Sequence, residues 1–213
     1  MGIDAVERVD YQAPPLDEHT MCADPVEEFR RWLKAAVDVG LSEPNAMTLA
    51  TADGAGVPSA RTVLLKQFDA QGFVFFSNYQ SRKGREIAEN PQCCLLFHWQ
   101  PLHRQVRING SVSSVSRKES MTYFDSRPEG ARIAAIASQQ SRPISSRDEL
   151  EKAWERTNSK LAGQSLVCPE TWGGFRVVPH EIEFWQGQSN RLHDRIVYRR
   201  DETGAWLRVR LQP

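Results

Sequence analysis

No stretch of this sequence is apolar over the roughly 20 residues that a membrane-spanning helix needs. The chain also lacks an excess of charge of either sign, because 27 Lys and Arg residues balance 27 Asp and Glu residues. Proteins that bind nucleic acid usually carry a basic excess. The acidic, polar segment 1–18 lacks the apolar core of a signal peptide. We therefore expect neither a membrane nor a nucleic acid as a partner.

Motifs of several enzyme and metal-binding classes are missing. The five histidines show neither HxH nor HExxH spacing, so we expect no bound metal. The sequence has no GxSxG of serine hydrolases, no GxGxxG after a predicted strand and no phosphate-binding GxxxxGK[ST]. No CxxC occurs either. The four cysteines are Cys22, Cys93, Cys94 and Cys168. We interpret them as free thiols in a reducing cytosol, which predicts a cytoplasmic protein.

Short apolar strands and intervening helices make up most of the chain. Residues 1–23 lack periodicity and predict a mobile arm, whereas residues 24–213 predict a single domain. Strands with tight turns indicate an antiparallel sheet. The sequence therefore predicts an α+β fold, an antiparallel barrel with peripheral helices. Expected helices cover 25–39, 82–90, 116–126, 130–138 and 147–161; expected strands cover 46–51, 59–68, 73–77, 92–99, 104–116, 172–178, 181–185, 194–200 and 205–211.

Two cations stand at the start of the helix that follows Ser81, the expected N-cap. Arg82 and Lys83 in the first turn oppose the helix dipole unless an anion lies beside them. A helix N-terminus with free N–H groups and two cations has the outline of a phosphate site, although ordinary surface charge gives the same pattern. Arg61 and Lys66 are expected at opposite ends of one strand, on opposite faces.

The stretch 183–195 (EFWQGQSNRLHDR) is the most distinctive of the sequence. A strand runs into a polar turn, and a dense polar cluster follows. Such a cluster suits an anionic ligand or forms a charged edge strand, and spacing alone leaves both open. Together with the other cations and polar groups, this cluster predicts a site for phosphorylated, planar ligands, with Trp185 and Phe76 bordering a ring. The candidate binding residues are Arg61, Lys66, Arg82, Lys83, Gln105, Tyr123, Arg127, Gln140, Ser141, Arg191, His193 and Arg195.

Taken in order, these segments resemble the pyridoxamine 5'-phosphate oxidase family from about Arg8 to Pro213. The resemblance is carried by residues 61–66 (RTVLLK), 75–78 (FFSN), 81–84 (SRKG), 104–106 (RQV), 123–128 (YFDSRP), 138–141 (SQQS), 172–174 (WGG), 183–195 and 210–213 (RLQP). It implies a split-barrel flavoprotein, a homodimer with FMN at the subunit interface. The FMN-binding positions that it implies are Arg61, Thr62, Val63, Leu64, Phe76, Ser77, Arg82, Lys83, Gln105, Gln140, Ser141, Trp185 and Arg195.

The same resemblance implies an oxidase of vitamin B6 salvage. Pyridoxine 5'-phosphate or pyridoxamine 5'-phosphate is oxidised at the 4' carbon to pyridoxal 5'-phosphate; a hydride equivalent passes to the flavin, and O2 reoxidises it with release of H2O2. The flavin carries the redox chemistry, while the protein positions both rings. Substrate positions are Arg8 and Tyr11 on the arm, Lys66, Tyr123 and Arg127 at the phosphate, and Arg191 and His193 over the ring; the last two are also the implied catalytic residues.

One substrate position departs from the family. Ala131 stands where members often have a serine whose hydroxyl contacts the substrate phosphate. Loss of one neutral hydrogen bond costs on the order of 1 kcal/mol when water replaces it, so we expect weaker substrate binding with the chemistry intact. A purely structural histidine, held by Asp194 or by the backbone, is the alternative interpretation of His193.

Two other functions remain open. The first is a related split-barrel flavin oxidase that acts on another ring, such as a phenazine precursor. The retained set of Lys66, Tyr123, Arg127, Arg191 and His193 argues against it. The second is a protein that binds flavin or pyridoxal 5'-phosphate and stores or delivers it without producing peroxide.

Overall fold

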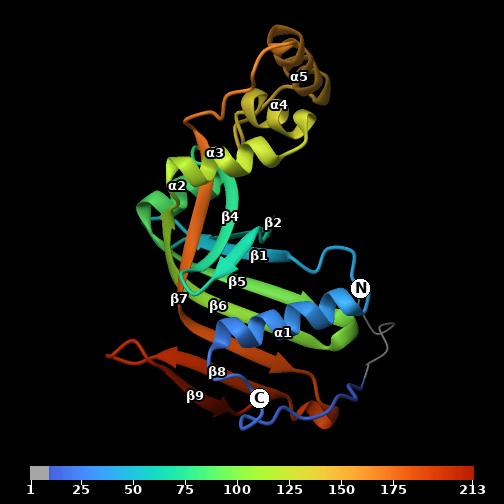
Figure 1. Ribbon diagram of the computed structural model, residues 1–213, viewed down its shortest axis with the longest axis vertical. Helices are drawn as coiled ribbons and strands as arrows, with labels where there is room; N and C mark the ends of the chain where they lie inside the picture. Colours follow the sequence, from blue (N-terminus) through green and yellow to red (C-terminus); the bar gives the residue numbers. More distant parts are fainter. Residues whose placement is uncertain (1–9) are drawn as a thin grey trace. The chain divides into compact units, whose positions relative to one another are not determined.

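The computed structural model describes residues 10–213 and contains an α+β fold built on an antiparallel sheet (Figure 1). Hydrogen bonds join its strands in the order β2-β1-β5-β6-β7-β4-β3, with β8 on β7 and β9 on β8. The predicted fold class is therefore confirmed. The strands are β1 (Ala46–Ala52), β2 (Pro58–Leu64), β3 (Gln67–Asp69), β4 (Gly72–Asn78), β5 (Gln92–Trp99), β6 (Arg104–Ser114), β7 (Trp172–Gln186), β8 (Asp194–Arg200) and β9 (Trp206–Leu211).

Helices occupy the predicted places. They are α1 (Pro25–Asp38), α2 (Arg82–Glu89), α3 (Arg117–Ser126), α4 (Glu129–Ala137) and α5 (Arg147–Leu161), with short 3-10 turns at Gln100–Leu102 (η1) and Ser189–Arg191 (η2). Backbone contacts divide the chain into two compact units. Unit 1 comprises Met1–Thr48, Cys94–Gly110 and Pro179–Pro213, and unit 2 comprises Leu49–Cys93 and Ser111–Val178. Within residues 10–213, no helix is long and apolar enough to cross a membrane.

Unit 1 has its core beneath α1. Asp24 caps this helix by accepting a hydrogen bond from the Val26 N–H, as an N-cap aspartate does. The buried face of α1 presents Phe29 to Phe97 of β5 at a ring-centroid distance of 4.9 Å. Trp32 packs edge-on against Phe184 of β7 at 5.0 Å. The helix therefore covers strands that carry candidate site residues farther along (Figure 1).

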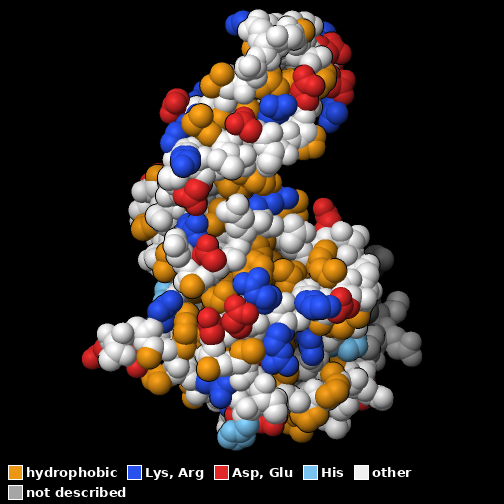
Figure 2. Space-filling view, in the orientation of Figure 1, with side chains coloured by type: hydrophobic (Ala, Val, Ile, Leu, Met, Phe, Trp, Pro, Cys, Tyr) orange, Lys and Arg blue, Asp and Glu red, His pale blue; other side chains and the backbone are white. Residues whose placement is uncertain are grey.

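Unit 2 contains the four remaining helices, and side chains set their boundaries. The Ser81 hydroxyl accepts from the Gly84 N–H at the start of α2. Ser116 and Glu119 form a capping box at the start of α3. That helix ends at Arg127, whose extended backbone (ψ 149°) precedes Pro128, because proline disfavours helical geometry in the residue before it. On the visible face of each unit, basic and acidic side chains are interspersed (Figure 2).

Two strand predictions were wrong. The expected strand 59–68 is split into β2 and β3, because the Lys66 N–H bonds to the Val74 carbonyl (2.9 Å) and the chain turns to pair with β4. Lys66 therefore lies between strands and not at the end of the strand that holds Arg61. The two expected strands 172–178 and 181–185 are one strand, β7. Its Pro179 falls after the ladder with β4 ends at Val177 and before the ladder with β8 begins at Glu181, so the missing N–H breaks neither ladder.

Candidate functional site

The predicted site residues divide between the two units. Unit 2 carries Arg61, Thr62, Val63, Leu64, Lys66, Phe76, Ser77, Arg82, Lys83, Tyr123, Arg127, Ala131, Gln140 and Ser141, and unit 1 carries Tyr11, Gln105, Trp185, Arg191, His193 and Arg195. Arg8 lies outside the described residues.

Lys83 is the buried cation of unit 2. Its side chain lies in the first turn of α2, and the residue is only 8% exposed. The ammonium nitrogen Nζ donates to Gln140 Oε1 at 2.9 Å and to Ser77 Oγ at 3.2 Å. Burial lowers the pKa of Lys83, and the positive charge of Arg61 lowers it further. No ion pair of the described chain includes Lys83. A buried ammonium with only neutral acceptors has the chemistry of an anion site.

Two neighbouring arginines share one carboxylate. Glu86 Oε2 lies 3.0 Å from Nη2 of Arg61, and Oε1 lies 2.8 Å from Nε of Arg82. Although burial raises the pKa of Glu86, hydrogen bonds from Ser59, Thr51 and both arginines lower it to about 2. Glu86 thus supplies the negative charge that Arg82 needs at the helix N-terminus and fixes the guanidinium of Arg61.

A half-buried cation of unit 2, Arg127, packs against aromatic side chains. The Phe76 and Tyr123 rings stack with centroids 3.9 Å apart, and the Arg127 guanidinium lies over Trp172 at 4.8 Å. Nη1 of Arg127 is buried and has no hydrogen-bond partner. Burial also lowers the pKa of Arg127. Since an unmatched buried donor costs free energy, this nitrogen fits an anionic acceptor from a ligand.

The remaining predicted residues of unit 2 are more exposed. Thr62 is exposed on β2, while Val63 and Leu64 are half-buried there. The Lys66 side chain forms no hydrogen bond or ion pair within the described chain. Ser141 is exposed and has a positive φ of 70°, and Ala131 is half-buried on α4. Hydrogen bonds therefore join Ser77, Lys83 and Gln140, and Lys66 takes no part in them.

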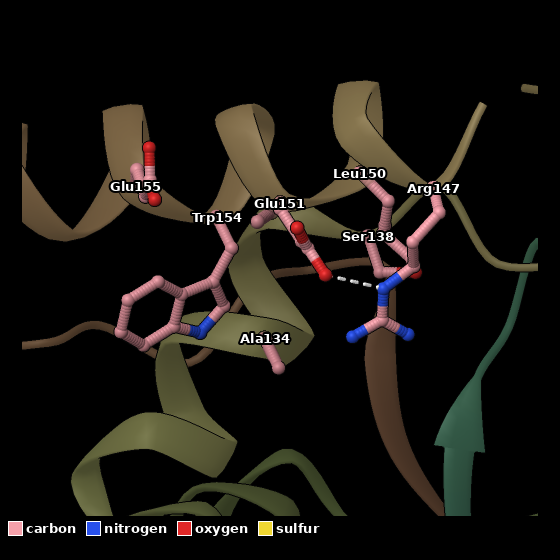
Figure 3. Close-up of a pocket in the computed structure, with 8 residues that line it drawn as sticks. Ala134, Ser138, Arg147, Leu150, Glu151, Trp154 and Glu155 are labelled. Carbon is pink, nitrogen blue, oxygen red and sulfur yellow. Dashed lines mark hydrogen bonds and ion pairs between the residues drawn. The ribbon is translucent and has the colours of Figure 1, made fainter. Parts of the chain in front are cut away.

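Helices α4 and α5 hold the loop that carries Gln140 and Ser141. Between them lies a groove of about 480 Å³, in which Ala134 of α4 faces Leu150 and Trp154 of α5 (Figure 3). The Trp154 indole N–H donates to the Gly130 carbonyl at 3.3 Å, which ties the two helices together. None of the predicted site residues lines this groove.

In unit 1, a small pocket of about 70 Å³ is lined by Leu96, Gln105, Arg107, Glu183 and Trp185. Both oxygens of Glu183 accept hydrogen bonds from Arg195, at 2.8 Å from Nε and 3.1 Å from Nη2. Two predicted cofactor residues thus line one pocket, and a third is paired with its buried carboxylate.

His193 is held by the backbone. Its Nδ1 accepts a hydrogen bond from the Gln188 N–H at 3.0 Å, so the neutral imidazole carries its proton on Nε2. Burial lowers the pKa of His193, and the charge of Arg191 lowers it further. Asp194 does not hold this ring, because its carboxylate accepts from the Leu16 N–H, the Gln188 amide and Arg210. The ring is therefore a neutral donor through Nε2.

Arg191 lies beside His193 in an unusual backbone geometry. Its φ is 65° and that of Asn190 is 56°, both in the left-handed region. Positive φ is rare for residues other than glycine and asparagine, and such strain collects at functional sites. The Arg191 side chain is exposed.

The Tyr11 ring packs against the rings of His103, His193 and Trp185. Its ring centroid is 4.4 Å from that of His103, 5.8 Å from His193 and 6.1 Å from Trp185. The Ser189 hydroxyl donates to the Tyr11 carbonyl at 2.9 Å. A Cβ on Gly187 would lie 2.5 Å from Cδ2 of Tyr11, so only glycine permits this approach. Tyr11 and His193 therefore lie together in unit 1.

Sequence reasoning missed the acidic residues Glu86 and Glu183. Glu86 stands four residues after Arg82, a spacing that brings side chains together on a helix. The ion pair between Arg82 and Glu86 could therefore have been predicted from the sequence. Glu183 lies between the apolar Ile182 and Phe184, and this alternation predicts that its side chain faces solvent. In the structure Glu183 is only 6% exposed. Only the tertiary structure reveals that both faces of β7 are covered there.

Two protein-family models match this chain. A model described as pyridoxamine 5'-phosphate oxidase covers residues 33–160, and one described as the pyridoxine 5'-phosphate oxidase C-terminal dimerisation region covers residues 172–213. A protein of Rubrobacter xylanophilus named pyridoxine/pyridoxamine 5'-phosphate oxidase is 51% identical over 97% of this chain and 94% of its own. The chain belongs to the pyridoxamine 5'-phosphate oxidase family.

Other members and structures agree with this assignment. An identically named protein of Thermosynechococcus vestitus is 53% identical, over 97% of both chains. The crystal structure of PhzG from Burkholderia lata, in complex with tetrahydrophenazine-1-carboxylic acid, is 31% identical with a TM-score of 0.86, over 92% of this chain and 95% of that one. An FMN-binding protein from Nostoc punctiforme shares the fold, with a TM-score of 0.73 at 15% identity over 91% of this chain and 100% of that one.

Proposed function

We propose that this protein is an FMN-dependent oxidase that converts pyridoxine 5'-phosphate or pyridoxamine 5'-phosphate to pyridoxal 5'-phosphate, with O2 as acceptor and H2O2 released. Relatives about 50% identical over nearly the whole chain carry the corresponding name. One structural observation supports it above others. Unit 2 holds the buried Lys83 and the half-buried Arg127, whose Nη1 is itself buried, and neither forms an ion pair in the described chain. Two unmatched cations suit two phosphorylated ligands, a cofactor and a substrate.

The residues around Lys83 fit the phosphate of FMN. Arg61 and Arg82 add positive charge, while Ser77, Gln140 and Ser141 add neutral polar groups. A Cβ on Gly84 would lie 2.1 Å from the Tyr79 carbonyl oxygen, so only glycine lets the first turn of α2, which carries Lys83, pack against the backbone at Tyr79. Further cofactor contacts are proposed for Thr62, Val63, Leu64, Phe76, Gln105, Trp185 and Arg195. When bound, the flavin would accept a hydride equivalent from the substrate and pass its electrons to O2.

The substrate phosphate is assigned to Lys66, Tyr123 and Arg127. Nη1 of Arg127 is one of two buried side-chain donors of the described chain that lack an acceptor, the other being Nε of Arg132, and a phosphate oxygen would satisfy it. In this family member, Ala131 contributes no hydroxyl, so the charge of the two cations has to supply most of the affinity.

Arg191 and His193 are assigned to the substrate ring. Since Nδ1 of His193 is engaged by the Gln188 N–H, the imidazole orients the ring by donating from Nε2 and does not take up a proton at Nδ1. Arg191 supplies positive charge beside it. Tyr11 packs against His193 and would exclude water from that side of the ring, which strengthens the electrostatic contacts.

We further propose a cytoplasmic homodimer with FMN at the subunit interface. The match of residues 172–213 to a family dimerisation region supports the dimer. Residues 1–23 are proposed as an arm that closes over the substrate, with residues 24–213 as a single FMN-binding domain. The hydrogen bonds of Ser189 and Gln188 to the Tyr11 and Pro14 carbonyls support the arm.

The test is the visible spectrum of the purified protein under anaerobic conditions. Addition of pyridoxine 5'-phosphate should bleach a flavin band, and air should restore it with pyridoxal 5'-phosphate and H2O2 formed. A band that bleaches only with a dihydrophenazine carboxylic acid would favour the alternative substrate. A band that stays oxidised with either substrate would favour storage or delivery of cofactor. A protein that takes up no FMN would refute the proposal.

A further inference from the structure

Glu183 is a buried carboxylate to which the proposed function assigns no role. It is 6% exposed and lines the pocket that also contains Gln105 and Trp185. Its Oε2 accepts from Nη2 of Arg107 at 2.6 Å as well as from Nη2 of Arg195 at 3.1 Å. One carboxylate oxygen therefore holds two guanidinium groups, both in unit 1.

The pairing with Arg195 is bidentate. Nε of Arg195 contacts Oε1 and Nη2 contacts Oε2, so the planar guanidinium has one orientation. The remaining nitrogen, Nη1, donates to the Gln212 carbonyl at 3.2 Å. Arg195 is also the cross-strand neighbour of Trp185 in the β7–β8 ladder. Its position relative to the pocket thus depends on Glu183.

We propose that Glu183 is a positioning residue for the flavin ring, and that it acts by holding Arg195 and Arg107 at the pocket beside Gln105 and Trp185. The inference rests on the proposed FMN site. It also gives a role to Arg107, to which the resemblance assigns no contact. With a neutral side chain at position 183, Arg195 would lose its carboxylate partner, and Arg107 would keep only the weaker pair with Glu181 at 3.4 Å. Arg195 would then leave the orientation that suits the ring.

A matched control lies two residues away. Glu181 points to the same face of β7 and accepts hydrogen bonds from Arg199 at 2.7 Å, from Asn109 at 3.1 Å and, at the longer distance of 3.4 Å, from Arg107. It does not line the pocket and has no contact with Arg195 in the described chain. Glu181→Gln therefore removes an ion-paired carboxylate from the same strand without changing the partner of Arg195.

The test measures the dissociation constant of FMN from the full-length protein by quenching of flavin fluorescence. We expect Glu183→Gln to raise it about tenfold, equivalent to about 1.4 kcal/mol, and Glu181→Gln to change it less than twofold. In an Arg195→Lys background, where no bidentate pair forms, Glu183→Gln should add less than a further twofold change. A general structural defect would instead act equally in both backgrounds.

The outcomes separate the two proposals. If the unaltered protein does not bind FMN, both the proposed function and this inference are overturned. If it binds FMN and Glu183→Gln leaves the constant unchanged, or acts equally in the Arg195→Lys background, only the inference is overturned. Should Glu183→Gln fail to fold, Glu183→Asp keeps the charge but shortens its reach, and an unchanged constant for that variant overturns the inference as well.

Discussion

At the scale of single residues, Ala131 is the position where a small change should improve the proposed enzyme. Ala131→Ser would restore a hydroxyl for the substrate phosphate, and one neutral hydrogen bond contributes about 1 kcal/mol. We expect KM for pyridoxine 5'-phosphate to fall about fivefold with kcat unchanged. Ala134→Ser, on the same helix but facing the α4–α5 groove, is the control. Equal kinetics for the Ala131→Ser and unaltered proteins would contradict this account.

Glu86 makes stability depend on acid pH. Its pKa is about 2 in the folded protein against an ordinary 4.5, so its carboxylate stabilises the fold above pH 4.5. That contribution is lost as the pH falls from 4.5 to 2, and it is worth up to roughly 3 kcal/mol. In urea unfolding, the unaltered protein should exceed Glu86→Gln in stability at pH 7 but not at pH 2.

Glu89 supplies the control for that experiment. It lies on the same helix, is exposed and accepts a hydrogen bond from the Gly54 N–H at 3.1 Å. Because substitution of an exposed group has a small effect, Glu89→Gln should change the free energy of unfolding by less than about 1 kcal/mol. A Glu86→Gln variant with the same pH dependence as the unaltered protein would remove the basis of the prediction.

At the scale of elements, the end of β7 determines where Tyr11 lies. Gly187→Ala would place a methyl group 2.5 Å from the Tyr11 ring and 3.1 Å from Cβ of His103, and overpacking of this kind costs about 1–3 kcal/mol. Displacement of Tyr11 should raise KM for the substrate at least fivefold, with FMN affinity within twofold of the unaltered protein.

Gly54→Ala is the matched control, since the nearest atom to its added Cβ is 3.6 Å away and its φ is not positive. It should leave KM unchanged. If Gly187→Ala and Gly54→Ala gave the same KM, Tyr11 would have no part in covering the substrate.

Local signals predicted the helices well and the strand ends poorly. Ser81, Ser116 and Ser146 each accept a hydrogen bond from a backbone N–H at the start of a helix, and such caps depend on neighbouring residues only. The break at Lys66 and the continuity through Pro179 depend on which strand pairs with which. Pairing partners lie far away in the sequence, so no local pattern encodes them.

At the scale of the whole molecule, the proposed dimer should control cofactor binding. β9 pairs only with β8 among the described strands and leaves Leu207 and Val209 exposed; exposed apolar side chains on an edge strand favour association. Sedimentation should give a mass of twice 24.2 kDa. Dilution that dissociates the dimer should also release FMN. A species of 24.2 kDa that retains FMN would contradict an interface site.

The sequence by itself determined the fold class, the helix starts and the family, because capping residues, apolar periodicity and ordered motifs are local or linear properties. It also predicted Arg61, Lys83 and Arg127 as candidate ligand-binding cations. The tertiary structure alone decided that Glu86 also pairs with Arg61 and that Lys83 and Arg127 have no acid partner in the described chain. It alone decided that Nδ1 of His193 is occupied and that Glu183 is buried between two arginines. Charge pairing and burial depend on residues distant in sequence, which only packing brings together.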